Sequence, residues 1–247
     1  MKICMLGDSI AKGVAYDEEK KKYFFLKDNF VSLLETGTGV RFTNLSKFGA
    51  TVTKGRMILD RFREPLSSCC YTFLEFGGND CDLNWEAVAD TPFELHPARV
   101  PLAAFQDRYR RLVDEVRRRG STPVLLTLPP LDPERFFRWI TRKLDSESVL
   151  EYLDGDPENI TKWHREYDDA VRMIAAEKEA PLIDIRRAFE ESASFRDLLS
   201  VDGMHPNAAG HRAIADFIRR DPLLNEKEPA SGPLLTFASP VSSFQII

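Results

Sequence analysis

The stretch Lys2-Ile3-Cys4-Met5-Leu6 runs directly into Gly7-Asp8-Ser9 at the start of the chain. A short apolar run that ends at a turn signal predicts a buried strand, so residues 2–6 are expected to form the first strand of a sheet. Gly-Asp-Ser is a common turn sequence, and taken alone it indicates only a turn into the next element. Its position after a strand would nevertheless place the Ser9 hydroxyl at the carboxyl edge of that sheet.

Similar apolar runs recur along the chain and are separated by longer stretches with helical periodicity. Further strands are expected at Arg41 to Leu45, Tyr71 to Phe76, Pro123 to Leu128 and Leu182 to Ile185. Helices are expected over Ala103 to Arg119, over about Thr161 to Lys178 and from near Pro206. Strands that alternate with helices predict an α/β fold, here a three-layer α/β/α sandwich around a flavodoxin-like, five-stranded parallel sheet. Ligands bind outside the carboxyl ends of the strands in such sheets.

The length and composition of the chain indicate a single large domain. It has 247 residues, and 43% of them are hydrophobic, which is enough for a sizeable core. The domain is expected over residues 1–224, with an inserted helical segment at about 129–159. Residues 225–247 form a tail whose composition shifts to Pro, Ser and scattered apolar residues. The sequence does not decide whether this tail packs on the domain, adds an edge strand or contacts a partner.

The charge of the chain limits its partners. The net charge is −5 and the pI is about 5.5, which disfavours nucleic acid, because phosphate backbones call for clustered Lys and Arg. The short basic runs Lys20 to Lys22 and Arg117 to Arg119 are interpreted as solvated helix faces. No apolar stretch approaches the ~20 residues of a membrane-spanning helix, so we expect no membrane insertion. The start of the chain leaves no room for a signal peptide, and the four cysteines form no Cys-x-x-Cys pair, so thiols and a cytoplasmic location are predicted. A homo-oligomer is compatible with these features.

Three further segments contain groups that could take part in catalysis. Two of them follow predicted strands, and the third begins the last helix. Asp202-Gly203-Met204-His205-Pro206 places a carboxylate three residues before a histidine, where it can accept from Nδ1–H and leave Nε2 free to take a proton. Gly77-Gly78-Asn79-Asp80 combines a sharp turn with an uncharged amide donor. Gly49 offers a backbone N–H after the second strand. Each segment has an ordinary explanation as a turn or cap, but their coincidence with Ser9 at one edge of a sheet indicates a single site.

These segments resemble the SGNH hydrolase family, also called GDSL hydrolases, whose name lists a serine, a glycine, an asparagine and a histidine from four separated blocks. The counterparts in this chain are Gly7-Asp8-Ser9-Ile10, Gly49, Gly77-Gly78-Asn79-Asp80 and Asp202-Gly203-Met204-His205-Pro206. The resemblance covers roughly residues 3–218, and its third and last blocks are the most specific. Ile10 stands where the other family name expects leucine, which is a change of apolar shape only.

The resemblance implies a role for each of these residues. Ser9 would attack an acyl carbonyl, His205 would accept its proton, and Asp202 would orient His205. The backbone N–H groups of Ser9 and Gly49, with the Asn79 side chain, would form the oxyanion hole. The reaction would be serine-dependent hydrolysis of a carboxylic ester, with a small-molecule ester as substrate and with no metal or organic cofactor.

Other catalytic motifs and other classes of function fit the sequence less well. Ala11 stands where the commoner Gly-x-Ser-x-Gly motif needs its second glycine, and zinc-protease, P-loop and dinucleotide-binding motifs are absent. His96, His164 and His211 are interpreted as structural or surface residues, and Cys81 as a bystander thiol. A non-catalytic small-molecule-binding module is the alternative from another class. An acyltransferase that passes the acyl group to another alcohol is the alternative among enzymes.

The substrate is left open by the resemblance, because the family covers carbohydrate acetylesterases, thioesterases, lysophospholipases and short-chain esterases. We expect a short-chain acyl ester, such as an acetylated carbohydrate, with lysophospholipase or thioesterase activity as the alternative. Phe136, Phe137 and Trp139, which recur at helical spacing in the inserted segment, are candidates for a wall or lid over the substrate. An aromatic face packed on the domain explains the same spacing equally well.

Overall fold

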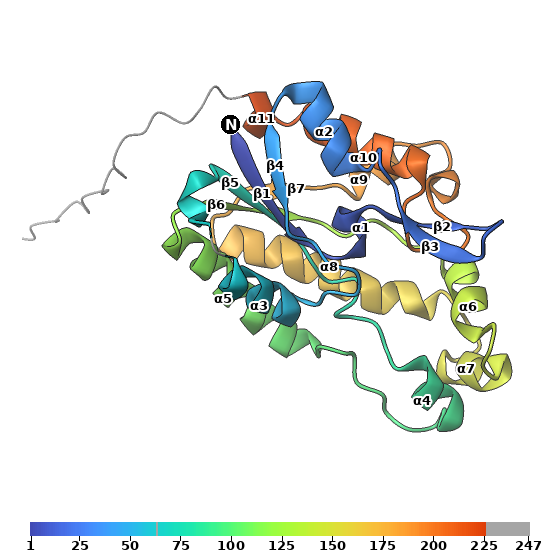
Figure 1. The fold of residues 1–247 in the computed structure, drawn as a ribbon. Coiled ribbons are helices and arrows are strands. Elements are labelled where there is room, and N and C mark those ends of the chain that lie inside the picture. Colours follow the sequence, from blue (N-terminus) through green and yellow to red (C-terminus); the bar gives the residue numbers. More distant parts are fainter. Residues whose placement is uncertain (63, 226–247) are drawn as a thin grey trace, which may run out of the picture.

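The central feature of the fold is one parallel sheet. The computed structural model describes residues 1–62 and 64–225, so the predicted tail lies, apart from Asn225, outside the described residues. Within this part, five parallel strands are ordered β4-β1-β5-β6-β7 (Figure 1). Their bounds are β1 Lys2–Gly7, β4 Arg41–Asn44, β5 Tyr71–Glu75, β6 Thr122–Leu126 and β7 Leu182–Ile183. The predicted five-stranded, flavodoxin-like sheet is therefore confirmed, and its strand order is the one typical of flavodoxin-like folds.

Helices cover both faces of this sheet, which gives the three predicted layers (Figure 1). One face packs against α3 Val52–Arg61, α5 Leu102–Arg118 and α8 Asn159–Glu177. The other face packs against α2 Phe30–Thr38, α9 Arg187–Glu190 and α10 Ala208–Arg219. The predicted helices at 103–119 and 161–178 are thus present as α5 and α8, and α10 begins two residues after Pro206.

The first strand shows how the sequence supports both layers. Successive side chains of a strand point to opposite faces, so Cys4 and Leu6 join the core beneath α3, α5 and α8, while Ile3 and Met5 join the core beneath α2 and α10. All four side chains are fully buried. An uninterrupted apolar run is what a central strand with two covered faces requires.

The inserted segment adds a small helical unit beyond the carboxyl ends of the strands. It forms α6 Pro133–Thr141 and α7 Ser146–Tyr152, and the side chain of Asp132 caps α6 by accepting from Arg135 N. These helices pack with α4 Trp85–Asp90 and the first turn of α8 around a separate apolar cluster. Its buried members are Leu83, Trp85, Val88, Leu131, Phe136, Val149, Leu153 and Ile160. This helical unit therefore borders the edge of the sheet at which ligands are expected to bind.

A β-hairpin that the sequence analysis does not predict lies beside α6 (Figure 1). After α1 Ser9–Lys12, which ends at Gly13, the antiparallel strands β2 Val14–Asp17 and β3 Lys22–Phe25 pair with each other outside the main sheet. Lys20 and Lys21 thus lie in the hairpin turn and Lys22 begins β3, so the interpretation of these residues as a helix face is wrong, although all three are exposed. The remaining short helices are η1 Leu66–Ser68, η2 Phe195–Leu198 and α11 Pro222–Asn225.

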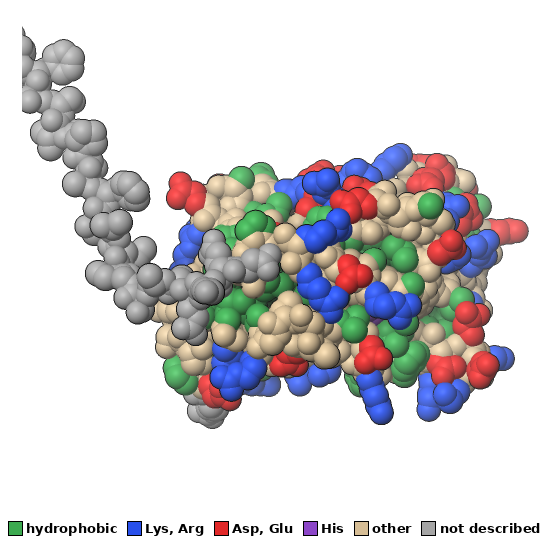
Figure 2. All heavy atoms as spheres, turned by 90° about the horizontal axis from the view of Figure 1, so that it is seen from above, with side chains coloured by type: hydrophobic (Ala, Val, Ile, Leu, Met, Phe, Trp, Pro, Cys, Tyr) green, Lys and Arg blue, Asp and Glu red, His purple; other side chains and the backbone are tan. Residues whose placement is uncertain are grey.

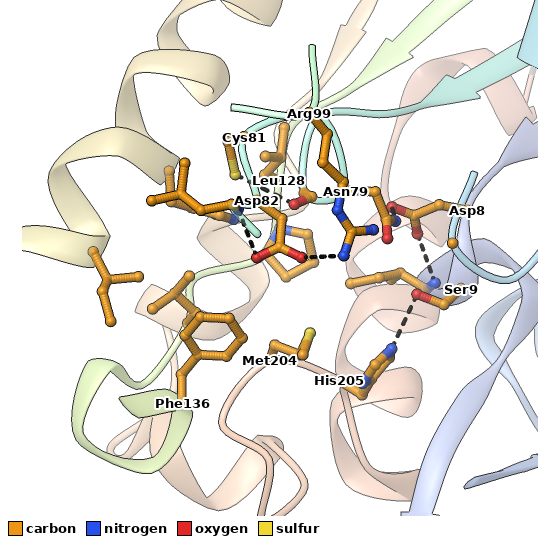
Figure 3. Close-up of a pocket in the computed structure, with 18 of the residues that line it drawn as sticks. Asp8, Ser9, Asn79, Cys81, Asp82, Arg99, Leu128, Phe136, Met204 and His205 are labelled. Carbon is orange, nitrogen blue, oxygen red and sulfur yellow. Dashed lines mark hydrogen bonds and ion pairs between the residues drawn. The ribbon is translucent and has the colours of Figure 1, made fainter. Parts of the chain in front are cut away.

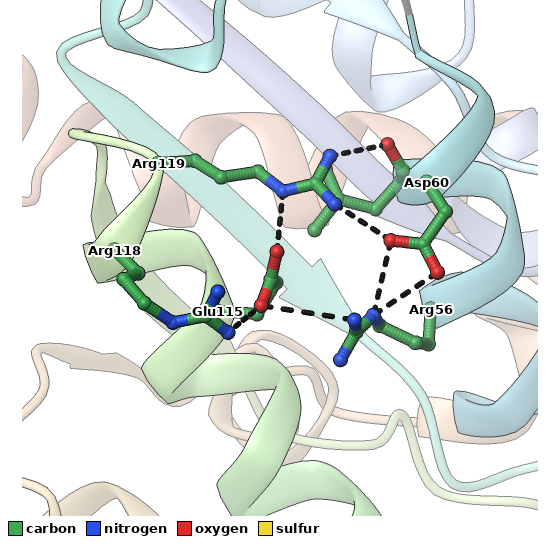
Figure 4. A network of polar contacts seen from close by, with 6 residues as sticks. Arg56, Asp60, Glu115, Arg118 and Arg119 are labelled. Atoms are coloured by element: carbon green, nitrogen blue, oxygen red, sulfur yellow. Dashed lines mark hydrogen bonds and ion pairs between the residues drawn. The ribbon is translucent and has the colours of Figure 1, made fainter.

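The charged side chains are organised in pairs and networks. At the helix ends remote from the ligand edge, buried Glu115 of α5 pairs with Arg118 and Arg119, and Arg119 also reaches Asp60 of α3 at 2.6 Å (Figure 4). Two of the three residues in the run 117–119 are therefore parts of an ion network between two helices. Basic and acidic side chains are interspersed on the face shown in Figure 2. Within the described residues, no helix is long and apolar enough to cross a membrane.

Candidate active site

The turn that follows β1 fixes Ser9 at the ligand edge of the sheet. Ser9 is the first residue of α1, and the Asp8 side chain caps this helix by accepting from Ile10 N at 2.8 Å. A Cβ on Gly7 would lie 2.9 Å from Ala11 Cβ and from Glu75 Oε2, so only glycine fits where the chain turns. The local sequence therefore builds a tight turn with the serine on its inner side.

The structure brings Asp202 and His205 to this serine. Nε2 of His205 lies 3.0 Å from Ser9 Oγ, and Nδ1 lies 2.7 Å from Asp202 Oδ2. Asp202 also accepts from the backbone N–H groups of Met204 and His205, both at 3.1 Å. Burial would raise the pKa of Asp202, but the hydrogen bond from the His205 ring, the charge of that ring and the backbone N–H groups of His205 and Met204 together lower it. Asp202 is thus an ionised acceptor, which favours the tautomer of His205 that leaves Nε2 able to take a proton.

Asn79 and Gly49 face the same space as Ser9. One N–H of the Asn79 amide donates to Asp8 Oδ2 at 2.7 Å, which orients the group and leaves its second N–H for a ligand. Gly49 has a φ of 66°, a backbone conformation that favours glycine. Within residues 1–62 and 64–225, the N–H groups of Ser9 and Gly49 have no acceptor. All three candidate oxyanion donors belong to residues that line one cavity.

Buried carboxyl groups that the sequence analysis does not single out support these turns from below. Glu75, the last residue of β5, accepts from Asp8 N at 3.2 Å and from Ala11 N at 3.4 Å. Asp80 accepts from Val52 N at 3.0 and 3.2 Å, and so ties the Asn79 turn to the start of α3. Burial raises the pKa of Glu75 well above its usual range and that of Asp80 to about 7. The sequence feature that could have identified Glu75 as a functional residue is its position as an acidic residue at the end of a mainly apolar strand.

The raised pKa of Asp80 predicts a pH-dependent contribution to stability. A carboxyl group whose pKa rises from 3.8 to about 7 on folding contributes stability that is present below pH 4 and is lost as the pH rises through about 7. Between pH 5 and pH 8, wild type should therefore lose about 2–4 kcal/mol more unfolding free energy than Asp80→Asn. Urea unfolding across this range measures the difference. Parallel curves for the two proteins would show that Asp80 is ionised throughout.

A cavity of about 240 Å³ extends from Ser9 and His205 toward α4, α6 and α8. Most of the side chains along it are apolar, and several are labelled in Figure 3. The apolar residues that line the cavity beyond the immediate surroundings of Ser9 and His205 are Leu83, Trp85, Leu128, Pro129, Leu131, Phe136, Ile160, Trp163 and Met204. A pocket that is mainly apolar with a few polar groups is the usual form of a small-molecule site. The chain thus offers a recessed space for part of a substrate beside Ser9.

The three aromatic residues proposed from the inserted segment have different positions. Phe136 lines the cavity and is 6% exposed. Phe137 packs at the edge of the helical cluster formed by α4, α6 and α7. Trp139 faces the hairpin, with its ring 4.5 Å from that of Tyr16. Neither Phe137 nor Trp139 is among the residues that line the cavity, so only Phe136 is placed to touch a substrate there.

Two further aromatic residues enclose His205. The rings of Tyr23, on the hairpin, and of Phe48 lie 5.3 and 6.2 Å from the His205 ring, and both residues line the cavity. Burial and the neighbouring Asp202 carboxylate raise the pKa of Tyr23, which therefore stays a neutral phenol. Contacts with two aromatic rings limit the rotation of the imidazole. Tyr23 has no counterpart in the sequence prediction.

Polar groups also border the cavity on the side of α4. Arg99 Nη2 pairs with Asp82 Oδ2 at 2.8 Å, and both side chains turn toward the cavity (Figure 3). Cys81 donates from Sγ to Gly78 O at 3.3 Å, and burial raises its pKa well above the usual range. The thiolate is disfavoured, which agrees with the interpretation of Cys81 as a bystander.

The other histidines fall into two groups. His96 contacts Thr91 and Tyr152, and buried His211 accepts from Phe30 N at 3.3 Å, so these two have the structural roles that the sequence analysis assigns. His164 is buried as well, but it lines the cavity. The interpretation of His164 as a purely structural or surface residue therefore does not describe its position.

Comparison with known proteins agrees with this geometry. The model of the GDSL-like lipase/acylhydrolase family matches residues 5–213. The chain belongs to this family. The resemblance and the esterase class predicted from the sequence are thereby confirmed, and the matched range contains Ser9, Gly49, Asn79, Asp202 and His205.

Individual relatives of this GDSL-type hydrolase are distant. It is similar to a lipase/acylhydrolase from Enterococcus faecalis, with a TM-score of 0.66 at 19% identity over 92% of this chain and 98% of that one. An acetyl-xylooligosaccharide esterase from Geobacillus has a TM-score of 0.59 at 21% identity, over 89% of this chain and 92% of that one. An uncharacterized protein of Bacillus subtilis, YpmR, is 20% identical over 222 residues, which are 86% of this chain and 78% of that protein. The two solved structures, from Enterococcus faecalis and Geobacillus, share the fold of this chain.

Proposed function

We propose that this GDSL-family hydrolase cleaves carboxylic esters through a Ser9-His205-Asp202 triad. The observation that carries the proposal is the continuous chain of contacts from Ser9 Oγ to His205 Nε2 at 3.0 Å and from His205 Nδ1 to Asp202 at 2.7 Å. The three side chains are no more than 5% exposed and open onto the cavity through Ser9 and His205. A nucleophile bonded to its base, with the base oriented by a third group, is the geometry of an activated serine.

The proposed reaction has two acyl-transfer steps. Ser9 Oγ attacks the ester carbonyl carbon while His205 Nε2 takes the hydroxyl proton, and the carbonyl oxygen becomes an oxyanion. The N–H groups of Ser9 and Gly49 and the free N–H of Asn79 would stabilise this charge. The C–O bond to the alcohol then breaks, and His205 returns the proton to the departing oxygen. Water attacks the acyl-Ser9 ester in the same way and releases the acid, which restores Ser9.

We propose a short acyl group as the preferred one, as in acetylated carbohydrates. Two proteins of the same fold are acetyl esterases of xylan or xylooligosaccharides by name. The Asp82–Arg99 pair at the cavity also offers a carboxylate and a guanidinium to the hydroxyl groups of an alcohol. The apolar lining of the cavity favours a second candidate, an ester with a longer acyl chain.

Hydrolysis of p-nitrophenyl acetate, butyrate and octanoate tests the reaction and separates the two candidates. We expect kcat/KM to be highest for acetate or butyrate and to fall by about tenfold or more for octanoate, because a small pocket penalises extra methylenes. A fluorophosphonate probe should also label Ser9, with the adduct located by mass spectrometry of the peptide. A rise in kcat/KM with chain length would favour the longer acyl esters. An unlabelled Ser9 would support a non-catalytic binding module, and faster product formation with added alcohol acceptors would support an acyltransferase.

A further inference from the structure

The end of the cavity away from Ser9 is formed by one face of α8. Ile160, Trp163 and His164 stand three and four positions apart, so their side chains share that face, and all three line the cavity. Apolar residues, among them Leu128 and Leu131, line the same cavity. His164 is therefore a polar group placed in largely apolar surroundings.

The ring nitrogens of His164 have no hydrogen-bond partner within the described part of the chain, and the ring borders the cavity. The residue is 7% exposed. Buried polar side chains are almost always paired, since each unpaired donor or acceptor costs free energy. Because the ring lines a cavity, a molecule in that cavity can supply the missing partner. His211 is buried too, but its Nδ1 accepts a hydrogen bond from Phe30 N, and its unpaired Nε2 does not border the cavity.

The charge around His164 defines the partner. Burial and the nearby Arg186 and Arg165 lower the pKa of His164 to about 3, so the ring is neutral and offers one N–H donor and one acceptor nitrogen. The positive charge of the two arginines disfavours a cationic ligand group. A carboxylate or phosphate would lose its hydration among Ile160 and Leu131, and Arg99, which also lines the cavity, is already paired with Asp82 at 2.8 Å. An uncharged oxygen function fits all of these conditions.

We propose that His164 is a specificity-determining residue that binds an uncharged hydroxyl, ether or carbonyl oxygen of the substrate, remote from the ester that Ser9 attacks. The proposal rests on the proposed esterase function and narrows its substrate class to esters that carry a second oxygen function. The flanking Trp163 and Phe136 would contact the carbon skeleton that bears this oxygen. Such a contact adds selectivity, because a site built to bind an oxygen discriminates against the analogue that lacks it.

The test compares esters that differ only in one oxygen. The acyl series is p-nitrophenyl hexanoate and its analogues in which one methylene is replaced by an ether oxygen at successive positions. The alcohol series is hexyl acetate and the monoacetates of hexane-1,n-diols. In one of the two series, wild type should prefer one oxygen position over the all-carbon ester by about tenfold in kcat/KM. His164→Leu should abolish this preference while it still hydrolyses the all-carbon ester.

Two variants make the result specific. His164→Gln keeps a hydrogen-bond donor group and an acceptor atom, and should retain part of the preference, whereas His96→Leu, outside the cavity, should retain all of it. If no oxygen position is preferred in either series, or if the preference survives in His164→Leu, the proposal is overturned. Failure of the proposed function has a different signature, since hydrolysis of the all-carbon ester would then persist in Ser9→Ala.

Discussion

Ser9→Ala is expected to lower kcat for p-nitrophenyl butyrate by roughly 10⁴- to 10⁶-fold. The substitution removes the Oγ atom that lies 3.0 Å from His205 Nε2, so neither the acyl-enzyme nor the proton transfer that forms it is available. The backbone donors of Ser9 and Gly49 and the Asn79 amide are unaffected, and binding should change little. The loss should therefore appear in kcat, with KM close to that of wild type, in steady-state assays.

A matched control is available for this substitution. Ser46, after β4, is also fully buried, and its hydroxyl has no hydrogen-bond partner in the described part of the chain. Ser46→Ala deletes the same atom type outside the cavity and should preserve kcat, with equal or higher stability because an unpaired buried hydroxyl is removed. Equal activity of Ser9→Ala and wild type on purified, folded protein would refute the proposed nucleophile.

The sheet and the catalytic blocks could be predicted for one physical reason. Strands that are buried on both faces need apolar runs such as Lys2 to Leu6 and Tyr71 to Phe76. Each such strand can therefore be recognised from its own residues alone. Parallel strands bring their carboxyl ends to one edge, so Ser9, Gly49 and Asn79 meet there without any knowledge of side-chain contacts.

The walls of the site could not be predicted in this way. The hairpin residues Lys22 to Phe25 are mostly exposed and show no clear alternation, so their strand pairing has no sequence signature. Tyr23 gains its role from His205, which is distant in the chain. Helical spacing identified the aromatic face of α6, but the elements opposite decide that Phe136 enters the cavity while Trp139 packs on the hairpin. His164 illustrates the same limit, because only the packing of α4 and α6 around α8 creates the space that it faces.

Asp202→Asn is expected to lower kcat by about 10⁴-fold while the fold and the Ser9–His205 distance are kept. The carboxylate accepts from His205 Nδ1 at 2.7 Å, and a neutral amide in its place can donate to Nδ1, which stabilises the tautomer with the proton on Nε2. That tautomer cannot take the Ser9 proton. Steady-state kinetics should show the loss in kcat, together with slower fluorophosphonate labelling of Ser9.

Asp184→Asn is the matched control for this substitution. Asp184 binds Arg172 and Thr127 away from the cavity, so its replacement tests the effect on stability alone. If Asp202→Asn kept wild-type kcat, His205 would not depend on Asp202 for its tautomer, and the triad would reduce to a Ser9–His205 pair.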